Sequence, residues 1–67
     1  MGYALFGKDS HTGEVSNYGT FRTEETGREA MRDRYIWDWL LSETFEGSFG
    51  DYLLEPDVRY ELLKEEI

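Results

Sequence analysis

Eleven of the 67 residues are aromatic (four Phe, five Tyr and two Trp), and none is Cys. A chain of this length buries only about 60% of its unfolded surface, so a stable core needs either covalent cross-links or large side chains. Disulfides are excluded here, whereas each buried ring removes roughly 150–250 Å² from water. Aromatic residues at this frequency also argue against intrinsic disorder. The sequence therefore predicts one small folded domain, spanning residues 1–67, with a core of aromatic rings.

The first third of the chain has the pattern of a β-hairpin. Strand-like segments at 3–6 and 15–21 flank a turn-forming cluster at 9–13. Gly7 and Gly19 lie beside or within these segments. Glycines at such positions indicate bulges or places where another element comes close to the backbone.

The middle of the chain predicts a long helix. Thr23 is a candidate N-cap and is followed by two glutamates, which suit the positive end of a helix dipole. Thr26 is a second candidate, because Glu29 follows it at capping-box spacing. The helix should end near Thr44, since Gly47 and its neighbours interrupt the pattern.

The predicted helix has two apolar sides. At 100° per residue, Ala30, Trp37 and Leu41 share one side, which we expect to lie on the hairpin. Tyr35 and Trp39 fall on the opposite side. One interpretation makes that second side a core seam covered by the C-terminal segment, as such stripes usually are. The other leaves it exposed as an interface, since Tyr and Trp are enriched at binding hot spots.

The last third allows two conformations. Pro56 suits the first position of a helix and Asp57 its first turn, so a terminal helix over 56–67 is favoured. Val58, Tyr60 and Leu62 also alternate with charged residues, as in a strand, and 55–57 would then be the turn of a second hairpin. The expected fold is α+β: an N-terminal β-hairpin packed on a long central helix, plus a short acidic C-terminal helix or second hairpin.

Negative charge is concentrated in the second half. Lys and Arg number 7 against 15 Asp and Glu, a net charge of −8 that disfavours direct binding of nucleic acid. Residues 1–37 hold six acids and five bases (−1), and residues 38–67 hold nine acids and two bases (−7). Such a surface is either a solvated face or a binding surface for a basic protein. The candidate partner-binding carboxylates are Asp38, Glu43, Glu46, Asp51, Glu55, Asp57, Glu61 and Glu65.

Spacing adds to the second interpretation. On a terminal helix, Asp57, Glu61 and Glu65 would lie about 6 Å apart in steps of four residues. One DNA strand carries a phosphate per ~3.4 Å of axis, so the charge densities would be comparable.

Catalytic and cofactor motifs do not emerge from the sequence. Asp9, Ser10 and His11 are the three residue types of a catalytic triad, but neighbours in one turn cannot readily align as nucleophile, base and orienting acid. The same loop does not match the ligand series of a calcium-binding EF-hand, and one His without Cys cannot form a histidine or thiolate metal site. We expect a chain this small to lack a ligand pocket of 300–1,000 Å³. The prediction is a non-enzyme without metal or cofactor.

Location follows from segments that the sequence lacks. No apolar run approaches the ~20 residues of a membrane span. The first residues lack the pattern of a signal peptide, so we expect a cytoplasmic protein.

In size and charge the chain resembles the small acidic inhibitors made by bacteriophages and mobile elements, such as anti-CRISPR, anti-restriction and DNA-glycosylase-inhibitor proteins. The resemblance implies an inhibitor that occupies the basic nucleic-acid-binding groove of a host enzyme or defence complex. The alternative is a small adaptor or regulatory module that binds a partner, or itself as a homodimer, through Tyr35 and Trp39.

Overall fold

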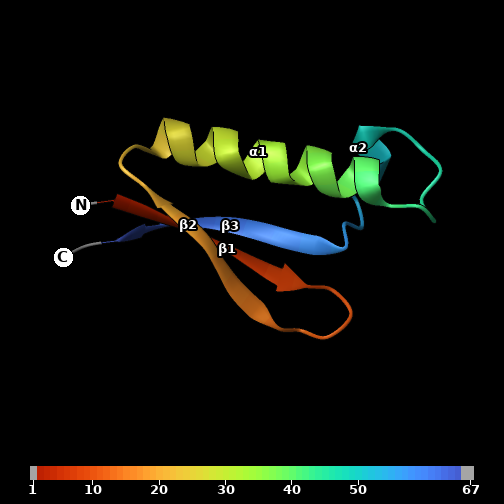
Figure 1. Cartoon of the computed structure of the whole chain (residues 1–67), viewed down its shortest axis with the longest axis horizontal. Helices are drawn as coiled ribbons and strands as arrows, with labels where there is room; N and C mark the ends of the chain where they lie inside the picture. The colour runs from red at the N-terminus through yellow and green to blue at the C-terminus, as the bar shows by residue number, and fades with distance from the viewer. Residues whose placement is uncertain (1, 66–67) are drawn as a thin grey trace.

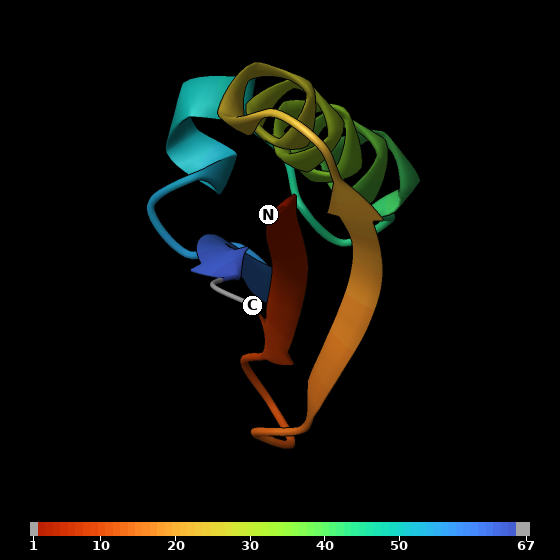
Figure 2. The same cartoon turned by 90° about the vertical axis from the view of Figure 1, so that its left-hand side faces the viewer.

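A computed structural model describes residues 2–65 and shows an α+β fold (Figure 1). The predicted N-terminal hairpin on a long central helix is confirmed. Both helices lie on the same side of a three-stranded sheet (Figures 1 and 2). The elements in chain order are β1 (Gly2–Asp9), β2 (Val15–Phe21), α1 (Glu24–Leu41), α2 (Phe49–Tyr52) and β3 (Val58–Glu65).

The C-terminal segment is a strand, so the favoured terminal helix is wrong. β3 runs antiparallel to β1 along the whole strand, from Gly2 opposite Glu65 to Asp9 opposite Val58, which makes β1 the central strand in the order β2-β1-β3. The alternating pattern over 58–62 therefore gave the right conformation. The second hairpin is also wrong, because α2 and not a strand precedes the turn at 55–57. Glu66 and Ile67, the last residues of the predicted element, lie outside the described residues.

Local side-chain hydrogen bonds explain the turn between β1 and β2. Asp9 Oδ1 accepts hydrogen bonds from the backbone N–H groups of His11 (2.7 Å) and Thr12 (3.0 Å). These donors favour the ionised carboxylate and hold the pKa of Asp9 below its usual value. Gly13 has a φ of 76°, which glycine adopts without strain.

Helix α1 begins where the sequence predicts. The Thr23 side chain accepts a hydrogen bond from Thr26 N–H (3.2 Å), which confirms Thr23 as the N-cap. The helix ends at Leu41, three residues before the predicted end, where the Ser42 N–H bonds to the Trp39 carbonyl (3.3 Å).

The helix packs on the sheet with a different side from the one predicted. Gly27 is buried against Leu62, and a Cβ at Gly27 would lie 2.7 Å from Leu62 Cδ1. Trp37 and Leu41, expected on the hairpin, are instead exposed. The prediction failed because it assigned charged positions such as Asp38 to solvent, whereas Asp38 finds a hydrogen-bond donor on β3.

Candidate functional site

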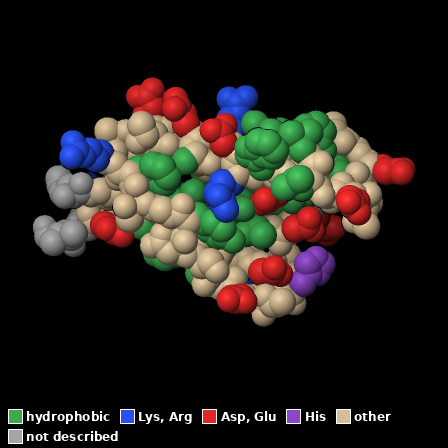
Figure 3. Space-filling view, viewed as in Figure 1, with side chains coloured by type: hydrophobic (Ala, Val, Ile, Leu, Met, Phe, Trp, Pro, Cys, Tyr) green, Lys and Arg blue, Asp and Glu red, His purple; other side chains and the backbone are tan. Residues whose placement is uncertain are grey.

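One end of the molecule carries a group of exposed carboxylates. We call residues 42–57 the acidic end: they connect α1 to β3 and lie where α1 ends (Figure 1). Acidic side chains gather at this end in the space-filling view (Figure 3). The segment contains no Lys or Arg, and its exposed carboxylates are those of Glu43, Glu46, Asp51, Glu55 and Asp57. Two basic side chains from outside this segment approach it: His11 Nε2 lies 3.7 Å from Asp57 Oδ1, and Arg59 donates to the Leu54 carbonyl (3.0 Å).

The helix backbone adds to this negative potential. The C-terminus of an α-helix carries a partial charge of about −0.5, which cations in the last turn usually offset. The last turn of α1 has no basic residue, and Glu43 and Glu46 lie two and five residues after its last residue, Leu41. The dipole and the carboxylates therefore act in the same direction at this end.

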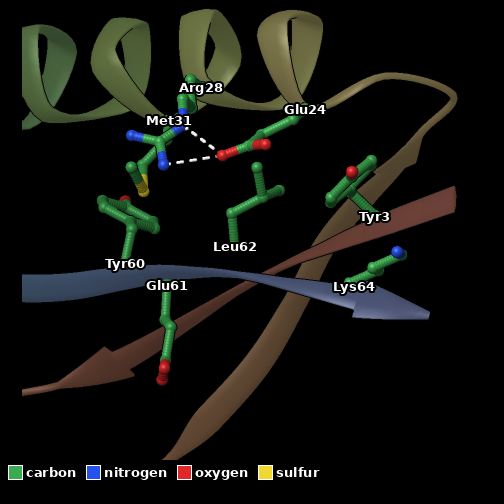
Figure 4. Close-up of a pocket in the computed structure, with 8 residues that line it drawn as sticks. All are labelled: Tyr3, Glu24, Arg28, Met31, Tyr60, Glu61, Leu62 and Lys64. Carbon is green, nitrogen blue, oxygen red and sulfur yellow. Dashed lines mark hydrogen bonds and ion pairs between the residues drawn. The ribbon is translucent and has the colours of Figure 1, made fainter.

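The other three predicted carboxylates lie elsewhere. Asp38 faces the sheet, where its Oδ2 accepts a hydrogen bond from the Tyr60 hydroxyl (2.6 Å). Glu61 pairs with Phe6 in the β1–β3 register and points away from α1 (Figure 4). Glu65 lies opposite Gly2, at the far end of β3.

The helical spacing of Asp57, Glu61 and Glu65 does not occur. Asp57 precedes β3, and Glu61 and Glu65 lie within it. Four strand residues span about 13 Å rather than 6 Å, since each rises ~3.3 Å. Five of the eight predicted carboxylates are thus grouped at the acidic end. This end offers a partner a concentration of negative charge, not carboxylates spaced like the phosphates of DNA.

Tyr35 and Trp39 contact other parts of the same chain. The Tyr35 hydroxyl accepts a hydrogen bond from Tyr60 N–H (2.8 Å), and the two rings meet edge to face with centroids 4.8 Å apart. Trp39 Nε1 donates to the Gly47 carbonyl (3.2 Å), and its ring lies 5.6 Å from that of Phe49. This packing matches the core-seam interpretation.

A polar and aromatic cluster joins α1 to the sheet. The Arg34 guanidinium lies over the Tyr18 ring, 4.0 Å from its centroid, and 5.8 Å from the centroid of Tyr60. Burial and the hydrogen bond to Asp38 raise the pKa of Tyr60, so in the folded protein this phenol stays protonated beyond the pH at which a free tyrosine ionises. A neutral phenol donates to Asp38 and does not act as a base, which fits a structural role for the cluster.

A groove lies between α1 and β3 (Figure 4). Its volume is about 540 Å³, so the expectation that so small a chain would lack a pocket of this size is wrong. Sequence reasoning missed it because the pairing of β3 with β1 was not predicted. Arg28 and Glu24 form an ion pair at its upper side (Nη2 to Oε1, 2.7 Å). The lining residues are Tyr3, Glu24, Arg28, Met31, Tyr60, Glu61, Leu62 and Lys64.

Residues 2–65 hold neither a metal-binding cluster nor a helix suited to crossing a membrane. Within that range no group of three or more His, Asp or Glu side chains is placed to hold a metal ion. None of the helices described there has the length and apolar character needed to cross a membrane.

Comparison with known proteins gives no match. No family model matches the chain, and neither does any curated protein or solved structure. A functional assignment therefore depends on the residues themselves.

Sequence reasoning missed one exposed apolar surface. Trp37, Leu40 and Leu41 of α1 are 62%, 62% and 69% exposed. Their i, i+3, i+4 spacing is that of a stripe along a helix, but the sequence predicts Trp37 and Leu41 against the hairpin rather than in solvent.

Proposed function

We propose that this protein is a small non-catalytic inhibitor that binds a basic protein surface through its acidic end. The observation that carries the proposal is charge segregation. Between Arg34 and Arg59 the chain contains six carboxylates and no Lys or Arg, and five of the six are exposed at one end of the molecule. A surface potential of one sign steers a protein toward partners of the opposite sign.

The basic surfaces best suited to this end are those that bind nucleic acid. Such surfaces are far more positively charged than ordinary protein interfaces, so a carboxylate-rich protein competes for them with the phosphate backbone. The proposed partner is a nucleic-acid-handling enzyme or defence complex in the cytoplasm, and the proposed origin of the inhibitor is a bacteriophage or mobile element.

Retention of cellular proteins on the immobilised chain tests the proposal. Nuclease-treated bacterial lysate is applied at low and high salt, with and without competing duplex DNA. One variant neutralises three carboxylates of the acidic end: Glu43→Gln, Glu46→Gln and Glu55→Gln. A matched control neutralises three exposed carboxylates outside the acidic end: Glu25→Gln, Glu29→Gln and Glu61→Gln.

The expected result is a nucleic-acid-handling protein that the wild type and the control retain and the acidic-end variant loses. Duplex DNA should release it by competing for the basic surface. High salt should release it because screening shortens the reach of charges to ~3 Å at 1 M salt. Retention of the same partner by the acidic-end variant, or indifference of the complex to DNA, would reject the proposal.

A further inference from the structure

Helix α1 exposes three large apolar side chains near its C-terminal end. We call Trp37, Leu40 and Leu41 the apolar ridge, since i, i+3 and i+4 positions lie side by side on a helix. They are 62%, 62% and 69% exposed, whereas Tyr35 and Trp39 pack within the molecule. Hydrophobic side chains gather over this part of α1 in the space-filling view (Figure 3).

The apolar ridge is costly to leave in water. An aromatic side chain has roughly 150–250 Å² to bury, and most of Trp37 remains exposed. Contiguous exposed apolar patches on small proteins commonly mark binding sites, and Trp is among the residues most enriched at binding hot spots. Nothing else in the described chain covers the ridge.

The charges along α1 indicate what covers it. Asp33 lies one turn before Trp37, and Glu43 and Glu46 follow Leu41, all three exposed. The nearest base along the helix, Arg34, is engaged over the Tyr18 ring rather than spread over the ridge. The ridge is therefore bordered by exposed carboxylates on both sides along the chain: Asp33 before it, and Glu43 and Glu46 after it.

A second copy of the chain fits this border poorly. Two ridges packed face to face would bring their flanking carboxylates together, in a chain whose net charge is −8. Like charges placed opposite each other across an interface cost several kcal/mol. A partner with an apolar face bordered by Lys and Arg meets both the ridge and its border.

We propose that the apolar ridge docks a basic amphipathic helix of the partner protein, with Trp37 as the central anchor. A row of side chains along a helix packs between the rows of a second helix, which is why the occupant is helical. The inference rests on the proposed function in that the partner is basic. It adds that recognition needs apolar contact, whereas a pure charge mimic would need carboxylates alone.

A designed peptide tests this docking directly. The probe is a helical peptide of Leu and Lys with all Leu on one face, and its control has the same Lys residues with Gln in place of Leu. Binding is followed by tryptophan fluorescence, which shifts to shorter wavelength when an exposed indole is covered. The ridge variants are Leu40→Ser and Leu41→Ser, and the matched control is Leu54→Ser, at a leucine that is 72% exposed outside the ridge.

The wild type should bind the Leu/Lys peptide at least tenfold more tightly than the Gln/Lys peptide. Each ridge variant should lose about fivefold or more in affinity, whereas Leu54→Ser should stay within about twofold of the wild type. Equal binding of the two peptides, or unchanged binding by both ridge variants, would overturn the proposal. So would sedimentation of the free protein as a dimer that Leu41→Ser dissociates, since the occupant would then be a second copy.

Failure of the proposed function looks different. In that case the acidic-end variant keeps its cellular partners, while the preference for the Leu/Lys peptide and its loss in the ridge variants still stand. The two results therefore separate the role of charge from the role of the ridge.

Discussion

Replacement of Gly7 by Ala tests how tightly the sheet packs under α1. Gly7 is buried in the central strand, and a Cβ there would lie 2.6 Å from Tyr18 Cε2, 2.8 Å from Val58 Cγ1 and 2.9 Å from Tyr60 Cε1. Carbon atoms in good contact are about 3.5–4.0 Å apart, so all three neighbours must move. The Tyr60 ring resists this because its hydroxyl is bonded to Asp38.

The magnitude follows from two opposing effects. Adding a methyl group to a filled core typically costs ~1–3 kcal/mol. Removing the flexibility of glycine from the unfolded chain returns ~0.4–1 kcal/mol. We expect a net loss of about 1–2 kcal/mol in the free energy of unfolding, which for a domain of this size lowers Tm by roughly 4–8 °C per kcal/mol.

Urea unfolding followed by tryptophan fluorescence measures this loss. Gly50→Ala is the control, since a Cβ there meets nothing closer than Ser48 Oγ at 3.9 Å and Gly50 lies in α2. That variant should be as stable as the wild type or up to ~1 kcal/mol more stable. A Gly7→Ala protein with the wild-type midpoint and slope would show that the space beside Gly7 is not filled as described.

Three further substitutions test the hydrogen bonds that begin α1 and connect it to β3. Thr23→Ala removes the helix N-cap and should cost ~0.5–2 kcal/mol in urea unfolding, whereas a loss below that range would mean that another group caps the helix. Tyr35→Phe removes the partner of Tyr60 N–H and should cost ~0.5–1.5 kcal/mol, with faster hydrogen exchange at that amide; unchanged exchange would contradict the bond. Because the pKa of Tyr60 is raised in the folded state, the unfolded chain loses this proton first, near pH 10, and stability should fall as the pH rises above that value. The fall should be smaller in Tyr60→Phe, and an identical pH profile for the two proteins would refute this assignment.

The parts of the fold that were predictable depend on neighbours in the sequence. The Asp9 turn and the Thr23 cap are made by side chains that bond to backbone groups two or three residues away, so local residue types reveal them. The conformation of 58–65 depends instead on β1, some fifty residues earlier. The alternation of 58–62 is visible in the sequence. It does not decide between helix and strand, because Pro56 and Asp57 are common at the start of a helix as well as in a turn.

The inner side of α1 could not be predicted from hydrophobicity. Arg34 and Asp38 face the sheet because an aromatic ring and a phenol hydroxyl are there to receive them. Those partners come from β2 and β3, so the helix sequence alone gives no sign of them. The same error hid the apolar ridge, since placing Trp37 inward removed it from the candidate surface. By contrast, the charge of the acidic end could be counted directly from the sequence.

The hydroxyl of Tyr35 also governs how the sheet ends. β3 is an outer strand, and its Tyr60 N–H and carbonyl point away from β1, where the Tyr35 hydroxyl bonds to both (2.8 and 3.4 Å). A strand from another molecule would need these same groups to continue the ladder, which is how exposed edges seed intermolecular sheets. With the middle of β3 already bonded to a helix side chain, such growth is interrupted there. Helix α1 thus both covers one face of the sheet and occupies the outward-facing backbone groups of Tyr60, in the middle of one of its two open borders.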